Sequence, residues 1–138
     1  MKLEKEKIRV ERLVDHLLSR GYMTLSRKYS KYLPKPPSIN GWDIDVVASI
    51  TEPVYFKSKY RKKIAIGITL SDKDLDDPQL LSRLNKLANL KTKSNSKVTL
   101  FVGVPANKIL QADMIINLLD DEVKNKIKLV PIIDEDDR

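Results

Sequence analysis

The chain has 138 residues, of which 41% are hydrophobic, and a formal net charge of +7 at pH 7. This length suits one globular core, so we expect a single α/β domain over residues 1–133, followed by an acidic tail at 134–138. No apolar run reaches the roughly 18 residues of a membrane helix, and the charged N-terminus is unlike a secretory signal, so we expect a cytoplasmic protein without a membrane partner.

The first half of the chain predicts one helix and then three strands. Apolar residues recur at helical spacing before Gly21, which predicts an amphipathic helix over about residues 3–20. The stretch "YMTLSRK" alternates like a half-buried strand, and a proline-rich loop follows it. Two further strands are predicted at "WDIDVVASI", residues 42–50, and at the central "KKIAIGITL", residues 62–70, with a break at 51–53.

The second half predicts alternating helices and strands. Asp77 and Pro78 are suited to begin a helix with a leucine-rich buried face. "KVTLFVGV" predicts a buried strand, Asn107 a helix that runs to about Leu119, and "IKLVPII" a last strand. The order αβββαβαβ predicts a mixed central sheet flanked by helices, with parallel neighbours wherever a helix intervenes.

Basic residues concentrate in the first half and alternate with aromatic ones. Residues 1–63 hold 15 Lys and Arg against 7 Asp and Glu, whereas residues 64–138 hold 11 against 12. The segments "SRKYSKYLPKPPS" and "VYFKSKYRKK" interleave cations with Tyr or Phe, as surfaces that bind phosphates and stack on bases do. The alternative is a solvated surface that only confers solubility. The candidate nucleic-acid-binding residues, with DNA as the expected partner, are Arg27, Lys28, Lys31, Lys57, Lys59, Arg61, Lys62 and Lys63.

Two acidic residues interrupt the second predicted strand. Because strand side chains alternate, Asp43 and Asp45 are expected to share one face, opposite their apolar neighbours. The chain has no Cys and a single His, so a metal ion here would be a hard cation such as Mg²⁺ held by the oxygens of Asp43 and Asp45. The alternative is that the two carboxylates hydrogen-bond to backbone or pair with Arg27 or Lys28.

Together these motifs resemble the PD-(D/E)xK nuclease superfamily, in particular the small archaeal Holliday junction resolvases. The resemblance rests on the helix "VERLVDHLLSRGY", the basic strand that ends at Ser30, and "WDIDVVA" before a central apolar strand, and it covers about residues 8–104. It implies a restriction-endonuclease-like fold and a homodimer. It also implies that Asp45 matches the strand Asp of the family and Glu11 the Glu of its first helix.

The Glu-x-Lys motif of that superfamily is absent from the third predicted strand. The corresponding positions are Gly67 and Thr69, or Ala65 and Gly67 in the neighbouring register, and residues 64–70 contain neither an acid nor a Lys. Two carboxylates and a Lys are needed together to bind Mg²⁺ and to orient the attacking water. We therefore expect a DNA-binding protein that has lost catalysis and requires no cofactor. Its vestigial site residues are Glu11, Asp43 and Asp45.

Two other functions remain open. An active Mg²⁺- or Mn²⁺-dependent endonuclease could have moved its site, with Asp43 and Asp72 as acids and Lys62 or Lys63 as the lysine. A noncatalytic scaffold subunit of a larger complex would instead bind a second copy or another protein through an apolar face.

Overall fold

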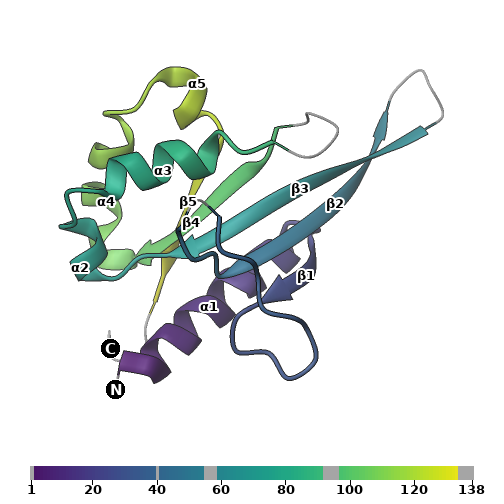
Figure 1. Cartoon of the computed structure of the whole chain (residues 1–138), viewed down its shortest axis with the longest axis horizontal. Helices are drawn as coiled ribbons and strands as arrows, with labels where there is room; N and C mark the ends of the chain where they lie inside the picture. Colours follow the sequence, from purple (N-terminus) through teal and green to yellow (C-terminus); the bar gives the residue numbers. More distant parts are fainter. Residues whose placement is uncertain (1, 40, 55–58, 92–96, 134–138) are drawn as a thin grey trace.

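The computed structural model describes residues 2–39, 41–54, 59–91 and 97–133 (Figure 1). The predicted acidic tail and Lys57 lie outside this part of the chain. Within it, no helix is long and apolar enough to cross a membrane. The elements in chain order are α1 (Lys2–Ser19), β1 (Met23–Arg27), β2 (Val46–Val54), β3 (Lys59–Thr69), α2 (Asp72–Leu75), α3 (Leu80–Ala88), β4 (Thr99–Pro105), the 3-10 turn η1 (Ala106–Lys108), α4 (Ile109–Ile116), α5 (Asp121–Lys124) and β5 (Ile127–Ile132).

The five strands form one mixed sheet in the order β1-β2-β3-β4-β5. β1, β2 and β3 are antiparallel neighbours, whereas β3, β4 and β5 run parallel. The parallel pairs are those joined through helices, because a crossover is needed to bring the chain back to the same end of the sheet. β3 lies at the centre, as its apolar sequence predicts, and the predicted mixed sheet flanked by helices is confirmed.

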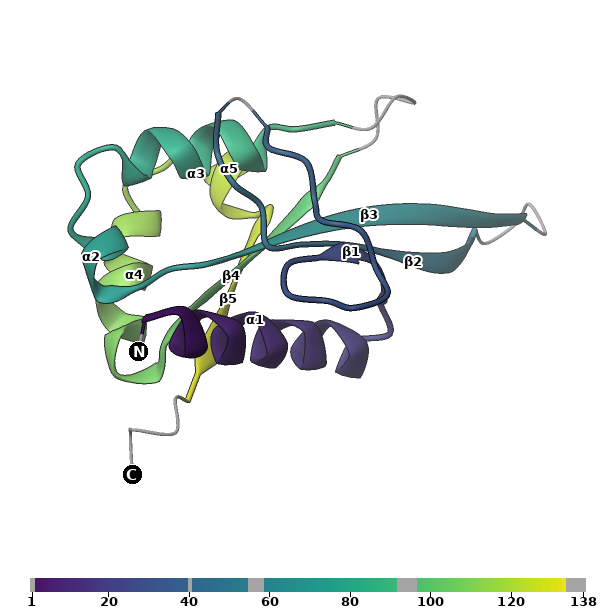
Figure 2. The same cartoon turned by 60° about the horizontal axis from the view of Figure 1, so that its bottom comes forward.

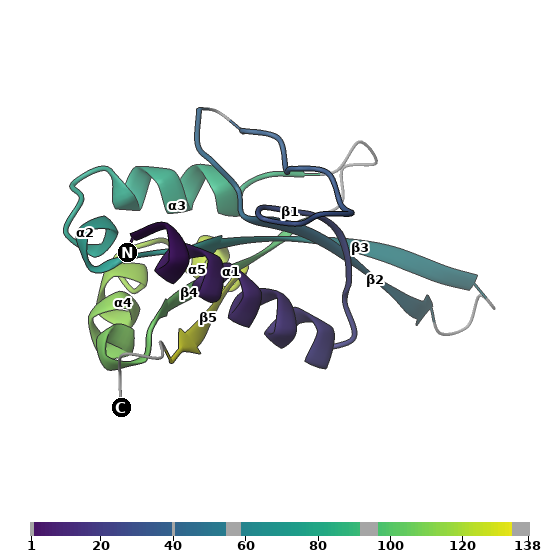
Figure 3. The same ribbon diagram turned by 90° about the horizontal axis from the view of Figure 1, so that it is seen from below.

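Helices cover the two faces of this sheet separately. α1 crosses one face and α3 lies on the other (Figures 2 and 3). α4 contributes to the same core as α3. The buried side of α1 carries Val10, Leu13, Val14 and Leu17, packed against apolar residues of β2, β3, β4 and β5. The helix ends before Gly21, whose φ of +91° is a conformation that glycine adopts without the steric cost of a Cβ.

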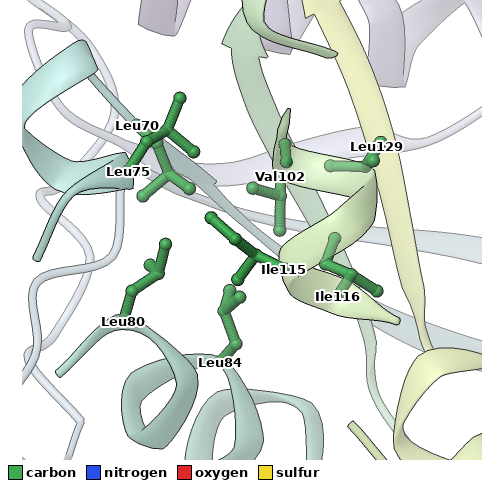
Figure 4. A pocket seen from close by; sticks show the side chains of 9 residues that line it. Leu70, Leu75, Leu80, Leu84, Val102, Ile115, Ile116 and Leu129 are labelled. Atoms are coloured by element: carbon green, nitrogen blue, oxygen red, sulfur yellow. The ribbon is translucent and has the colours of Figure 1, made fainter. Parts of the chain in front are cut away.

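The opposite face holds the larger apolar core. Leucine and isoleucine side chains from α2, α3 and α4 converge on residues of the sheet, as Figure 4 shows for Leu75, Leu80, Leu84 and Ile115. Among the residues that line this region, the side chains leave no space for a water molecule. This region is therefore a packed core and not a ligand cavity.

The bounds of β2 differ from the prediction at both ends. Residues 42–45 lie outside β2, which begins at Val46, so Ile44 and Val46 do not share a face: Ile44 is buried in the core beneath α3 and Val46 in the core beneath α1. The predicted break at 51–53 is wrong, because β2 continues through Pro53 to Val54. Pro53 is tolerated because β1 pairs with β2 only as far as Ser49, which leaves this part of β2 at an edge.

The helical starts in the second half also differ from the prediction. Asp77 does not cap the long helix, which begins at Leu80 after Gln79. Instead, Ser71 caps the short α2 through a reciprocal capping box with Asp74. Asn107 lies within η1, and the helix predicted to run to about Leu119 is the shorter α4, which ends at Ile116. The short helix α5, which was not predicted, follows after residue 120.

Candidate functional site

Asp45 is a buried acidic residue at the bend immediately before β2. Its side chain is 6% exposed. Its Oδ2 accepts hydrogen bonds from the backbone N–H of Thr69 at 2.6 Å and from the Thr69 hydroxyl at 3.0 Å. The backbone N–H of Asp45 donates to the Gly67 carbonyl at 2.9 Å, so the residue is attached to β3 at three points. Such charge-assisted bonds satisfy a carboxylate that burial would otherwise penalise.

The other carboxylate oxygen of Asp45, Oδ1, contacts Lys28, the residue that follows β1. Lys28 Nζ lies 3.2 Å from Asp45 Oδ1, and the backbone N–H of Lys28 donates to the Asp45 carbonyl at 3.0 Å. The contact is a cross-strand pair that continues the β1–β2 ladder beyond Arg27 and Val46. A β-bulge between Thr24 and Ser26 shifts this ladder by one residue, so that Lys28, and not Arg27, lies opposite Asp45.

Two further carboxylates approach the same ammonium group. Lys28 Nζ lies 3.7 Å from Asp43 Oδ2 and 4.0 Å from Glu6 Oε1 of α1. The predicted convergence of Asp43 and Asp45 is therefore present, although the two residues lie outside the strand. We call Glu6, Lys28, Asp43, Asp45 and Thr69 the Lys28 cluster.

Glu6, and not the predicted Glu11, is the helix acid that reaches this cluster. Glu11 lies on the exposed side of α1. Glu6 precedes Val10 by four residues and Leu13 by seven, which is the spacing that places side chains on one helix face. This periodicity was the available signal in the sequence. Tyr29, at φ +61°, lies near Glu6, and burial together with this carboxylate raises the pKa of the Tyr29 phenol.

The Lys28 cluster keeps its lysine charged. Burial by itself lowers the pKa of Lys28, but the attraction and hydrogen bond of Asp45, with smaller contributions from Asp43 and Glu6, outweigh it, so the pKa is raised above 10.5. At neutral pH the cluster therefore contains a permanent cation among its carboxylates.

Gly67 and Thr69, one of the two pairs of positions where the resemblance would place Glu-x-Lys, lie on β3 beside Asp45. A Cβ at Gly67 would lie 2.4 Å from Val46 Cγ1 and 2.9 Å from Leu13 Cδ2, so α1 packs onto the strand where an acidic side chain would have to project. Lys62 and Lys63 lie six or more residues back along β3, about 20 Å from Thr69 at the rise of a strand. Neither lysine reaches Asp45, and Asp72 is exposed at the start of α2.

The Lys28 cluster does not fit a divalent metal ion as it stands. Both oxygens of Asp45 are engaged, and an ammonium group lies where a cation would bridge the three carboxylates. Within the described ranges, no group of three His, Cys, Asp or Glu side chains is arranged to hold a metal ion. Asp43 is further occupied by the Ser38 hydroxyl, which donates to its Oδ1 at 3.1 Å.

The predicted nucleic-acid contacts divide into engaged and exposed cations. Lys28 belongs to the cluster, Lys63 pairs with Glu52 at 3.0 Å, and Arg27 is half-buried. The side chain of Lys59 lies outside the described part of the chain. The exposed cations are Lys31, Arg61 and Lys62. Exposed aromatic rings accompany them, since Tyr32 follows Lys31 and Tyr60 precedes Arg61, with exposed fractions of 93% and 76%.

Comparison of the chain with protein-family models, with curated proteins and with solved structures finds no match. The features that indicate a function are therefore the Lys28 cluster and the exposed cations themselves.

The environment of His16 predicts that the stability of the folded protein depends on pH. The imidazole packs near the Phe101 ring, with centroids 6.1 Å apart, and burial, with Arg20 nearby, lowers its pKa below 6.5. The unfolded chain then binds the proton more readily, so stability is complete above about pH 6.5 and declines as the pH falls below it. We expect an NMR titration of this single imidazole to give a value below 6.5. Replacement by Gln should reduce the stability difference between pH 7.5 and 5.5, and an equal difference in both proteins would contradict the prediction.

Proposed function

We propose that this chain is a nucleic-acid-binding protein, with DNA as its partner, whose restriction-endonuclease-like fold has lost catalysis. The observation that carries the loss of catalysis is Lys28 Nζ, which binds Asp45 at 3.2 Å and also contacts Asp43 and Glu6. An internal ammonium group neutralises the acids that a hydrolytic metal would need. The end of β3 supplies no lysine to Asp45, because Thr69 occupies the position beside its carboxylate.

Binding is supported by the separation of charge over the surface. The acids of the Lys28 cluster are paired with Lys28, whereas Lys31, Arg61 and Lys62 remain exposed beside Tyr32 and Tyr60. Exposed cations attract phosphates, and neighbouring aromatic rings can stack on bases. The cytoplasmic location expected from the composition remains part of this proposal.

The test is a series of binding and cleavage measurements on labelled single-stranded, duplex and branched DNA, with and without Mn²⁺. We expect binding without metal, an affinity that falls steeply between about 50 and 200 mM salt because counterions are released, and no cleavage in Mg²⁺ or Mn²⁺. Cleavage by the wild-type protein that Asp45→Ala abolishes would establish the endonuclease alternative. A lack of both binding and cleavage would favour the scaffold alternative.

A homodimer is the assembly that the exposed apolar side chains favour. Leu110, Met114 and Leu118 recur every fourth residue along α4 and the turn after it, and each is more than 70% exposed. Apolar side chains at this spacing form one continuous stripe, which a second copy can cover.

The dimer prediction is checked by light scattering or sedimentation at high micromolar concentration. We expect the mass of two chains for the wild type and of one chain for Met114→Asp, because a charge in an apolar interface is costly. Ser82→Asp, which adds the same charge at an exposed position of α3, should remain dimeric. A monomeric wild type would contradict the assembly without affecting the DNA-binding proposal.

A further inference from the structure

Part of the β2–β3 hairpin has no neighbouring strand in the described structure. β1 pairs with β2 only as far as Ser49, and β4 pairs with β3 only from Ala65 onward. Residues 50–54 and 59–63 therefore pair only with each other, in five successive pairs from Ile50 and Lys63 to Val54 and Lys59. We call these residues the ribbon. Figures 1 and 2 show this arm extending beyond the helices and the other strands.

The ribbon is strongly basic. Its sequence contains four basic residues, Lys59, Arg61, Lys62 and Lys63, and one acid, Glu52. The Glu52 carboxylate is neutralised by Lys63 at 3.0 Å. Arg61 and Lys62 are exposed and form no ion pair with any other residue that the structure describes. Because no ion pair within the described part of the chain uses them, these two exposed cations are available for a ligand.

These two cations lie on opposite faces of the ribbon. The pairing from Val46 to Val54 is regular, so alternation places Arg61 on the α1 side with Ala65, and Lys62 on the other side with Ile66. Tyr60, 76% exposed, shares the side of Lys62. A ligand that approached only one face would leave one cation unused, whereas a ligand that surrounds the ribbon would contact both.

The dimensions of the ribbon select the nucleic acid. Two strands are about 5 Å apart, so a two-stranded ribbon with its side chains is about 10 Å wide, and five pairs extend for about 17 Å. The major groove of B-DNA is about 12 Å wide and admits a two-stranded ribbon, with a phosphate backbone along each wall. The major groove of A-form RNA is deep and narrow and does not admit one.

We propose that the ribbon enters the major groove of duplex DNA, with Arg61 and Lys62 binding the phosphates of opposite walls. This inference rests on the proposed function, because it names the nucleic acid and the element that binds it. Addition of a protein strand to either free edge of the ribbon is disfavoured, since Pro53 on the β2 edge lacks an N–H and the β3 edge is rich in Lys and Arg.

The test compares a ribbon variant, Arg61→Gln with Lys62→Gln, against a control variant, Lys86→Gln with Lys128→Gln. The control removes the same charge from exposed positions on α3 and β5. Circular dichroism first verifies that both fold. The probes are a duplex DNA of about 20 base pairs, its single strand, and the same duplex as RNA. The wild type should prefer duplex DNA to duplex RNA by about tenfold or more, because only the B-form groove admits the ribbon.

We expect the ribbon variant to bind duplex DNA at least about tenfold more weakly at 50 mM salt, with a salt slope smaller by about 2, one unit for each lost phosphate contact. The control variant should bind duplex DNA with nearly the wild-type affinity and salt slope. Equal losses in both variants, or equal wild-type affinity for DNA and RNA duplexes, would overturn the inference while leaving the proposed function intact. A wild type that binds none of the probes would overturn the proposed function itself.

A chemical footprint checks the groove directly. Guanine N7 lies in the major groove and adenine N3 in the minor groove. We expect wild-type protein to protect guanine N7 from methylation by dimethyl sulfate over about five base pairs, the length that the ribbon spans. The ribbon variant should lose this protection. Protection of adenine N3 instead would assign the ribbon to the minor groove and contradict the inference.

Discussion

Replacing Lys28 with Met is expected to lower the free energy of unfolding by about 3 kcal/mol at pH 7, since it leaves the buried Asp45 carboxylate without its cation. Lys28 is the only group in the described structure that contacts Glu6, Asp43 and Asp45 together. Met retains the apolar stem, so most of the packing survives and the loss reports chiefly on the charge.

The measurement is denaturant unfolding followed by circular dichroism. The control is Lys31→Met, which removes an exposed cation from the neighbouring loop and should change stability by less than about 0.5 kcal/mol. Because the pKa of Lys28 is raised in the folded state, its contribution is present below about pH 10.5 and is lost as the pH rises through the folded value. Equal stability of Lys28→Met and wild type at pH 7 would mean that the Lys28 cluster does not stabilise the folded protein.

Replacing Asp45 with Asn is expected to cost about 2 kcal/mol of stability while leaving DNA affinity unchanged or slightly raised. The neutral side chain loses the ion pair with Lys28 and weakens the hydrogen bonds from Thr69, which carry extra strength when the acceptor is charged. Affinity should persist because Asp45 is buried and DNA would contact the exposed cations instead.

The same unfolding and DNA titrations test this second prediction. Asp43→Asn is the matched control, since the Asp43 side chain is 71% exposed and its loss should cost less than about 1 kcal/mol. A large loss of DNA affinity in Asp45→Asn, at a temperature where the variant remains folded, would place Asp45 at the binding surface. It would falsify the prediction that DNA contacts the exposed cations and not the Lys28 cluster.

The sequence by itself determined the order and type of the principal elements. The helical spacing before Gly21 predicted α1, and the apolar run at 62–70 predicted the central β3, because both patterns depend on local periodicity against a buried face. The sequence also shows that residues 64–70 contain neither an acid nor a Lys, and that the cations concentrate in residues 1–63.

Only the tertiary structure decided which charges meet. A β-bulge between Thr24 and Ser26 determines that Lys28 lies opposite Asp45, and no periodicity in the sequence specifies a one-residue shift between two strands. The choice of Glu6 over Glu11 depends on which side of α1 faces the sheet. The ribbon, too, depends on where β1 and β4 stop pairing, which is a relation between strands distant in the chain and not a property of any one of them.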